Sequence, residues 1–270
     1  MTHVLGKSVT YADTYQPSLL DAIPRQWQRD TIGVSNPLPF VGWDTWNAFE
    51  ISWLNTKGKP QVAVAHIQVP CTSPNLIESK SLKLYLNSFN NTRFENAEKV
   101  RRTISQDLSS ALLTGVKVVF FKIDDFNNTR LDKLSGTCLD DLDITVDDFL
   151  ITPAKDLKTK SDKVTELLYS HLLKSNCLVT GQPDWASVQI NYTGQQIDHA
   201  GLLRYLVSFR NHMEFHEQCV ERIYTDVMKY CKPEKLSVMA YYTRRGGIDI
   251  NPFRASDIQL IKPVKRLWRQ

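Results

Sequence analysis

The segment LKLYLNSFNN at residues 82–91 recurs at residues 202–211 as LLRYLVSFRN, an offset of 120 residues. The two segments share Leu, Tyr, Leu, Ser, Phe and Asn without a gap, and the same offset pairs Val100 with Val220. In all, eight of the 21 residues at 82–102 are identical to their counterparts, which is more than chance produces. Self-similarity at a fixed offset indicates two copies of one supersecondary unit. We therefore predict a duplicated fold.

Each copy predicts the same order of secondary structure. An alternating or apolar segment comes first, a long amphipathic helix follows, and a β-rich segment closes the copy. An acidic stretch at residues 140–148 ends near Thr152 and Pro153, where we place the boundary between modules 1–152 and 153–270. The expected segments are residues 62–69, 97–113 and 116–123 in the first copy and 187–192, 215–231 and 236–242 in the second.

Length and composition are typical of a globular chain with a large core. The chain has 270 residues, 42% of them apolar, and needs no disulfide to fold. Its five cysteines are odd in number and lack CxxC spacing, and we recognise no signal peptide, so free thiols in a reducing cytoplasm are expected. No apolar run approaches a membrane span. A net charge of +4 is too small to indicate nucleic-acid binding.

Two segments of the second copy have the residues for covalent chemistry. The sequence SNCLVTGQPDW at residues 175–185 contains Cys177 and Asp184, and FHE at residues 215–217 adds an imidazole and a carboxylate. A thiolate attacks electrophilic carbon well once a neighbouring charge or hydrogen bond lowers its pKa. The equivalent of Cys177 in the first copy is Lys57, so the unequal copies predict one composite site at the module junction. The alternative is a buried cysteine near a helix-capping aspartate.

Four motifs support a family resemblance. They are ESKSLKLY at 78–85, the loop from Cys177 to Asp184, EFHE at 214–217 and YTRRGGIDINP at 242–252. Together they resemble the NADPH-dependent 7-cyano-7-deazaguanine reductases, the nitrile reductases of queuosine biosynthesis, in their long two-module form. The resemblance spans both halves and implies an α+β fold of tandem tunnelling-fold modules, with antiparallel sheets backed by helices.

The resemblance also implies a mechanism. Cys177 would add to the nitrile carbon to give a covalent thioimide, and Asp184 would donate a proton to the nitrogen. Two hydride transfers from NADPH would then give 7-aminomethyl-7-deazaguanine, with His216 relaying protons or orienting the substrate. Because a carboxylate pairs with the N–H and amino group of a guanine-like ring, Glu217 is the candidate substrate contact. Glu78 would add a second carboxylate from the other module.

The cofactor site is expected without a Rossmann motif, because no GxGxxG sequence follows a strand and opens a helix. Arginine suits a 2′-phosphate, since its planar fork pairs with two oxygens. Without the family motifs, however, residues 244–247 are typical of an exposed turn after a strand. The NADPH contacts that the resemblance implies are Ser79, Lys80, Lys83, Arg244, Arg245 and Gly247.

Two other function classes stay open. A tunnelling-fold pterin or purine hydrolase of the GTP cyclohydrolase type would use Cys177 without forming an adduct, and a purine-binding module would catalyse nothing. His212, His216 and Cys219 have helical spacing that suits zinc, but CxxC and HExxH contexts are missing, so we expect no metal. We expect a homodimer, since open sheet edges invite pairing, and a small 7-deazaguanine partner without direct contact to nucleic acid or membrane.

Overall fold

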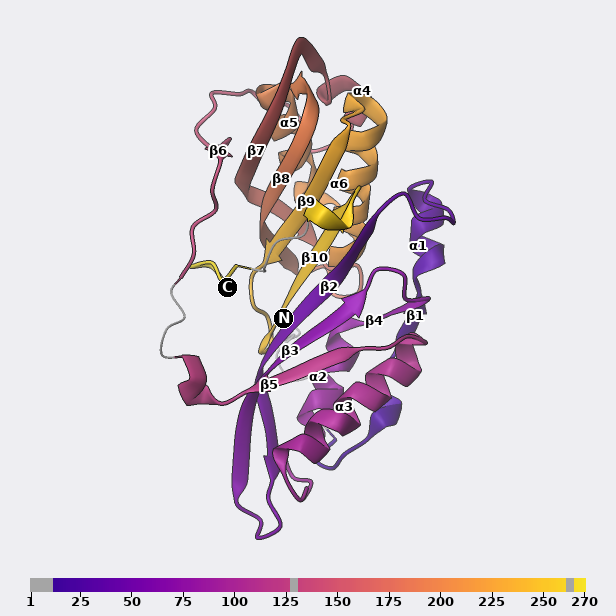
Figure 1. Ribbon diagram of the computed structural model, residues 1–270, viewed down its shortest axis with the longest axis vertical. Helices are drawn as coiled ribbons and strands as arrows, with labels where there is room; N and C mark the ends of the chain where they lie inside the picture. The colour runs from indigo at the N-terminus through magenta and orange to yellow at the C-terminus, as the bar shows by residue number, and fades with distance from the viewer. Residues whose placement is uncertain (1–11, 127–130, 261–264) are drawn as a thin grey trace, which may run out of the picture.

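The computed structural model describes residues 12–126, 131–260 and 265–270, and its main feature is one eight-stranded sheet (Figure 1). The strands of this sheet are β2 (Val41–Leu54), β3 (Pro60–Pro70), β5 (Lys117–Phe121), β6 (Thr137–Cys138), β7 (Thr159–Asn176), β8 (Pro183–Ile197), β9 (Lys235–Tyr242) and β10 (Ile248–Ala255). Their order is β5-β3-β2-β10-β9-β8-β7-β6, and all neighbours are antiparallel except β6 and β7. A separate two-stranded sheet pairs β1 (Ala22–Pro24) with β4 (Asn75–Ile77).

Helices pack against the sheet in both halves of the chain. The α-helices are α1 (Arg25–Thr31), α2 (Ser79–Asn87), α3 (Ala97–Leu112), α4 (Pro153–Asp156), α5 (His199–Val207) and α6 (His216–Cys231), and the 3-10 helices are η1 (Pro17–Leu19), η2 (Ile123–Phe126), η3 (Ser208–Asn211) and η4 (Ile258–Leu260). In Figure 1, α2 and α3 lie with the strands of the first half, and α5 and α6 with those of the second. Among the described helices, none is long and apolar enough to span a bilayer.

These elements confirm the α+β class and the antiparallel sheet backed by helices. The predicted helix at residues 97–113 corresponds to α3, and the one at 215–231 corresponds to α6. All four predicted β segments also lie on strands, namely β3, β5, β8 and β9. The module boundary at residue 152 falls directly before α4 and remains a prediction, because one sheet runs through both halves.

The repeated segments fold alike. Tyr85 in α2 donates a hydrogen bond to Asp107 in α3 at 2.6 Å. Tyr205 in α5 donates the equivalent hydrogen bond to Asp226 in α6, also at 2.6 Å. A buried tyrosine hydroxyl needs a hydrogen-bond partner, so each pair joins the short helix of its half to the long one.

The two halves meet where β2 pairs with β10. This antiparallel pairing extends over eight residue pairs. At Gly42 the strands approach so closely that a Cβ atom would lie 2.0 Å from the Phe253 carbonyl oxygen, and the backbone there has φ +150°. Only glycine fits such a position without a shift of one strand. The β2–β10 pair is therefore the joint that makes one sheet of the two halves.

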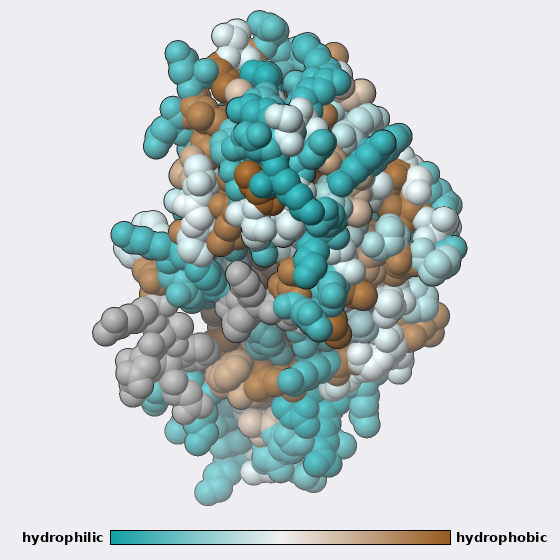
Figure 2. Space-filling view, turned by 45° about the horizontal axis from the view of Figure 1, so that its top comes forward, coloured by the Kyte–Doolittle hydropathy of each residue, from teal (hydrophilic) through white to brown (hydrophobic). Residues whose placement is uncertain are grey.

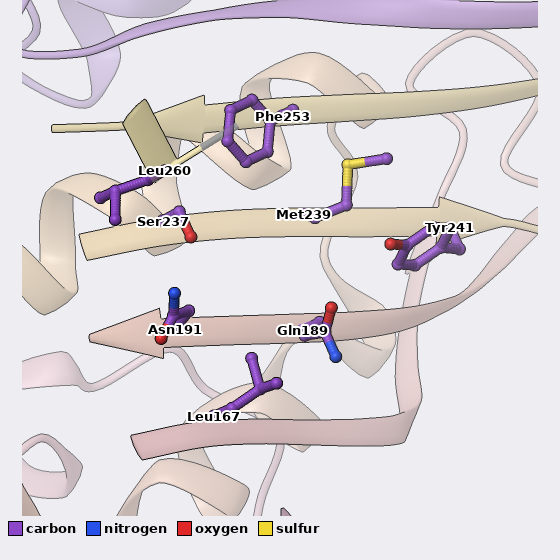
Figure 3. A pocket seen from close by; sticks show the side chains of 8 residues that line it. All are labelled: Leu167, Gln189, Asn191, Ser237, Met239, Tyr241, Phe253 and Leu260. Atoms are coloured by element: carbon purple, nitrogen blue, oxygen red, sulfur yellow. The ribbon is translucent and has the colours of Figure 1, made fainter. Parts of the chain in front are cut away.

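The sheet face turned away from the helices carries a pocket (Figure 3). Leu236, Val238 and Ala240 of β9 belong to the core under the helices, so the alternate residues of this strand point to the opposite face. The side chains that line the pocket are Leu167, Gln189, Asn191, Ser237, Met239, Tyr241, Phe253 and Leu260. None of the predicted site residues is among them, so the pocket is separate from the candidate site. Figure 2 shows a face covered mostly by hydrophilic side chains, with smaller apolar patches between them.

Candidate active site

Cys177 begins the loop that joins β7 to β8. Its N–H donates a hydrogen bond to the Gln182 carbonyl (2.8 Å), and its own carbonyl accepts one from the Gly181 N–H (2.9 Å). Gly181 has φ +67°, a conformation that residues with a side chain rarely adopt. The loop therefore closes as a tight turn, and Cys177 is buried in it, with 6% of its surface exposed.

The segment before α6 is fixed to the same end of β7. The Asn176 N–H donates to the His212 carbonyl (2.8 Å), and the Glu214 N–H donates to the Asn176 carbonyl (3.2 Å). The helix α6 then begins at His216. Because Asn176 directly precedes Cys177, these two hydrogen bonds hold the first turn of α6 close to the thiol.

Asp184 lies at the start of β8, opposite Ser175 of β7, and is 2% exposed. Its Oδ1 forms an ion pair with the guanidinium of Arg245 and lies 3.6 Å from Nε2 of His216. Burial would raise the pKa of this carboxyl, but His216 and Arg245 outweigh burial and hold the pKa below its usual value. Asp184 is therefore a carboxylate at neutral pH, buried between two cationic or ionisable partners.

His216 is held between Asp184 and an aromatic ring. Its imidazole meets Tyr242 edge-on, with ring centroids 4.1 Å apart and an interplanar angle of 89°. The side chain of His216 is 13% exposed. An imidazole in this position can hold or pass a proton to the Asp184 carboxylate.

Glu217 follows His216 on α6 and is 4% exposed. Within the described part of the chain, no other side chain donates a hydrogen bond to its carboxylate. Burial raises its pKa, and the nearby negative charge of Asp44 raises it further, whereas Arg25 and His216 act in the opposite direction. The carboxylate accepts a hydrogen bond from its own backbone N–H, and a ligand with two adjacent N–H groups would add donors to it and so offset the cost of its burial.

Glu78 has a structural role of its own, because its side chain caps α2. One carboxylate oxygen accepts the Lys80 N–H (2.9 Å) and the other accepts the Ser81 N–H (2.7 Å). Its repeat counterpart Asp198 caps α5 in the same way by accepting the Gly201 N–H (2.9 Å). Capping leaves lone pairs on the Glu78 oxygens, so a substrate contact there is compatible with this role.

Lys83 brings the first half of the chain to the thiol site. This half-buried lysine on α2 has a lowered pKa, first because of burial and second because of the positive charge of Arg245. Asp184, Glu78 and Cys177 act on it in the opposite direction. Four other predicted site residues, taken from both halves, therefore lie within electrostatic reach of Lys83.

Two other predicted cofactor contacts, Arg244 and Gly247, lie in the turn between β9 and β10, as Arg245 does. The Arg244 guanidinium stacks over Phe49, 3.6 Å from the ring centroid. Gly247 has φ +73°, and a Cβ atom there would lie 2.4 Å from Cδ of Glu50. The remaining two predicted contacts, in the first turn of α2, are Ser79 and Lys80.

Family models match both halves of the chain. The model described as "Nitrile reductase, 7-cyano-7-deazaguanine-reductase N-term" matches residues 11–120, and the model described as "QueF-like protein" matches residues 183–259. The chain belongs to the 7-cyano-7-deazaguanine reductase family. Two matched modules in one chain correspond to the long form of this family, and Cys177 lies between the matched ranges.

Membership of the reductase family makes the chain an oxidoreductase of the nitrile reductase class, with a small deazaguanine as the type of substrate. Among solved structures, this chain is similar to a crystal structure of the archaeosine synthase QueF-Like in the apo form. The matched region covers 37% of this chain and 99% of the archaeosine synthase chain. That match has 16% sequence identity and a TM-score of 0.32.

In this reductase-family chain the residues considered for zinc do not converge. His212 lies before α6 rather than on it, and its Nε2 is 2.9 Å from Oε1 of Glu214. His216 faces Asp184, while Cys219 is fully buried in the core. Across residues 12–126, 131–260 and 265–270, no group of three or more His, Cys, Asp or Glu side chains could hold a metal ion.

Sequence patterns missed a set of buried charges beside the candidate site. Their members are Arg25, Arg29, Asp44, Glu221 and Arg254. Two signals pointed to them: Arg25 and Arg29 have i, i+4 spacing, as do Glu217 and Glu221. Such spacing is usually a solvated face, which is why it did not stand out.

Proposed function

We propose that this chain reduces the nitrile of 7-cyano-7-deazaguanine to the primary amine of 7-aminomethyl-7-deazaguanine, with NADPH as reductant, in the queuosine pathway of tRNA modification. The observation that supports the proposal is that Cys177 and Asp184 of the second half and Glu78 of the first all lie within electrostatic reach of Lys83, whose Cδ is 3.0 Å from the Cβ position of Gly246 in the second half. This set contains a nucleophile, a proton carrier, a cation and a carboxylate, which together suit addition to a polarised triple bond.

Cys177 and Asp184 would carry the addition step. The sulfur forms a bond to the nitrile carbon, one π bond of the nitrile breaks, and the thiol proton must reach the nitrogen. Because Asp184 is ionised before the reaction, it accepts the proton from the thiol and then donates it to the nitrogen. The product is a thioimide on Cys177, and the sulfur leaves again as a thiolate before the last reduction.

Glu217 would hold the purine-like ring. Its buried carboxylate has two oxygens for the ring N–H and the exocyclic amino group, a bidentate pairing that is strong where water is excluded. His216, which precedes it, keeps its imidazole at Asp184 and so supplies protons near the reacting carbon. Glu78 would contact the ring from the first half while capping α2.

The residues around Lys83 fit a phosphate-bearing cofactor. Lys83 and Arg245 are like charges close enough to lower the pKa of the lysine, an arrangement that an anion would stabilise. Lys83, Arg245 and Lys80 would hold phosphate groups, with Ser79, Arg244 and Gly247 as further contacts. Two NADPH molecules, bound one after the other, would each supply one hydride, the first to the thioimide carbon and the second to the imine carbon. The homodimer and the cytoplasmic location remain predictions.

An intact-mass measurement after incubation with 7-cyano-7-deazaguanine alone tests the proposal. We expect a mass increase of one substrate on the wild type, none on Cys177→Ala, and the full increase on Cys138→Ala, which removes a partly exposed thiol elsewhere. Adding NADPH should then release the adduct from Cys177 and consume two equivalents of the cofactor. The nicotinamide absorbance measures this consumption. Turnover by Cys177→Ala would contradict the covalent step, and ring hydrolysis without NADPH consumption would instead support a hydrolase.

A further inference from the structure

The helix α6 begins without the cap that its counterpart in the first half has. Asn96 is the N-cap of α3, and its side chain accepts the Lys99 N–H at 2.9 Å. The N-cap of α6 is Phe215, whose side chain has no oxygen to accept a hydrogen bond. His216, the first residue of α6, nevertheless has to face Asp184 for the proposed chemistry. Another contact therefore has to fix the start of this helix.

A buried ion pair provides such a contact. Glu214, directly before the N-cap, is 2% exposed and accepts a hydrogen bond at 2.6 Å from Nε of Arg222 in the second turn of α6. A second guanidinium nitrogen of Arg222 pairs with the same carboxylate oxygen, and Nε2 of His212 lies 2.9 Å from it. Charge-assisted hydrogen bonds are strong where water is excluded. The pair therefore ties residues 212–214 to the body of α6.

The same short segment holds the backbone beside the thiol. The Asn176 N–H donates to the His212 carbonyl at 2.8 Å, and the Glu214 N–H donates to the Asn176 carbonyl at 3.2 Å. Asn176 directly precedes Cys177, and its side-chain oxygen accepts a hydrogen bond from the Lys174 ammonium at 2.7 Å. The ion pair is thus connected through hydrogen bonds to the backbone at Cys177 and through the chain to the first residue of α6.

The first half does not have this pair at the corresponding positions. Glu95 stands directly before the N-cap of α3, as Glu214 does before that of α6, but Glu95 is exposed. When the two helix starts are aligned, Thr103 occupies the place of Arg222. The first half also has Lys57 in place of the thiol. The buried pair therefore occurs in the half that carries the candidate nucleophile.

We propose that Glu214 and Arg222 are positioning residues for the thiol chemistry: their buried ion pair takes over from a helix cap and holds Cys177 and His216 in the arrangement needed for addition to the nitrile. This inference rests on the proposed function, since the adduct on Cys177 is its readout. The two residues act through the hydrogen bonds of Asn176 and through the first turn of α6. Their loss should therefore affect the rate of addition more than the affinity for the base.

Separate measurements of addition rate and base affinity test this inference. Rapid-mixing mass spectrometry gives the rate of adduct formation with 7-cyano-7-deazaguanine, and titration of the same variants in a Cys177→Ala background gives the affinity. Glu214→Gln and Arg222→Gln should each slow adduct formation by about 10 to 100 fold, because a small misplacement of reacting groups is costly. Affinity should stay within about twofold of the Cys177→Ala parent, because the proposed contacts of Glu217 and Glu78 remain.

The effects of the two changes should not multiply. Because both remove the same ion pair, the double variant should be no slower than the slower single variant, whereas independent losses would combine in full. Arg222→Lys keeps the positive charge, so it should lose less of the addition rate than Arg222→Gln. A fully multiplicative double variant would show that the two residues act separately and would contradict the proposed pair.

Two variants are matched controls. Glu95→Gln changes the glutamate at the same position of the first half and should leave rate and affinity unchanged. Tyr205→Phe removes the buried hydrogen bond from α5 to Asp226 and so loosens α6 away from residues 212–216. A merely structural role of the ion pair predicts the same slowing in Tyr205→Phe as in Glu214→Gln. The positioning role predicts a wild-type rate of addition in Tyr205→Phe.

The outcomes separate this inference from the proposed function. Absence of an adduct on the wild type contradicts the proposed function itself. Wild-type addition rates in both glutamine variants, or losses of rate and affinity by the same factor, would overturn the present inference alone. Should neither variant fold, hydrogen exchange of the wild type decides. The amides of Asn176 and Glu214 should exchange far more slowly than that of the exposed Val179 in the neighbouring loop, and equal exchange rates would overturn the inference.

Discussion

At the scale of single residues, the site has a carboxylate whose burial opposes folding. Glu217 has a raised pKa in the folded chain, so the stability that it contributes is present below its unfolded pKa and is lost as pH rises through the folded value. At neutral pH Glu217→Gln should therefore raise the melting temperature by about 2–4 °C, the shift that about 1 kcal/mol gives in a chain of this size. The same change should weaken base binding at least tenfold.

Thermal melts of both proteins at several pH values check this expectation. The gain in Glu217→Gln should shrink as pH falls towards the unfolded pKa of a glutamate. Gln218→Ala is the control, since Gln218 neighbours Glu217 and donates hydrogen bonds to α1 (2.9 Å to Thr31), so its loss should only destabilise. A glutamine variant that is less stable than the wild type would show that the ionised Glu217 carboxylate stabilises the free protein.

For Asp184, the stability of the fold depends on pH in the opposite direction from Glu217. Its lowered pKa means that it contributes stability above its unfolded pKa and that this contribution is lost as pH falls through the folded value. Asp184→Asn should slow formation of the Cys177 adduct by about 10² to 10⁴ fold, the usual share of a general acid or base. Rapid-mixing mass spectrometry measures the rate, and urea unfolding should show a stability difference from the wild type that is present at pH 7 and absent at strongly acid pH.

The residues that sequence motifs could identify are those that take part in local patterns. Each of these residues lies beside a turn signal or a helix start and also belongs to a family motif: Cys177, Asp184, His216 and Glu217. The i, i+4 spacing of Arg25 and Arg29 does not reveal the partner of Arg25, because Asp44 is on another element and the ion pair forms only when α1 docks on β2. Contacts of this kind depend on tertiary packing, which single-sequence periodicity does not contain.

At the scale of elements, the repeat offers a matched pair of helix caps. Glu78 caps α2 and Asp198 caps α5, and loss of either cap should cost about 1 kcal/mol. Glu78→Ala should in addition weaken base binding about tenfold, whereas Asp198→Ala should leave it unchanged. Denaturant unfolding and base titration of both variants check this. Equal binding by the two variants would restrict Glu78 to its capping role.

The strands that sequence patterns left out also have a physical reason. The strand β10 is buried at every position, including Asp249, Asn251 and Arg254, so it lacks the alternation of a half-exposed strand. The long strand β7 begins with exposed polar residues and becomes apolar only in its second part. By contrast β3 alternates between buried and half-buried positions from Ala63 to Pro70, and periodicity found it.

At the scale of the whole molecule, the pairing of β2 with β10 joins the two parts of the candidate site. The candidate nucleophile Cys177 and Lys83 lie in different halves, and β2 and β10 join these halves over eight residue pairs. Damage to this joint should therefore remove activity without touching any site residue. Because the sheet is continuous, unfolding should also be a single cooperative transition for both halves.

Gly42→Ala tests the joint. The added Cβ would lie 2.0 Å from the Phe253 carbonyl oxygen, so β2 must shift against β10, and we expect a loss of about 3 kcal/mol or more together with most of the adduct formation on Cys177. Gly33→Ala is the control, because Gly33 also has positive φ (+70°) but nothing lies within 4 Å of its Cβ position. That variant should lose only about 1 kcal/mol, the cost of the backbone conformation, and keep its activity. Urea unfolding and the adduct assay on both variants decide the matter, since equal losses would mean that backbone strain, rather than the close approach of β2 and β10, limits the fold.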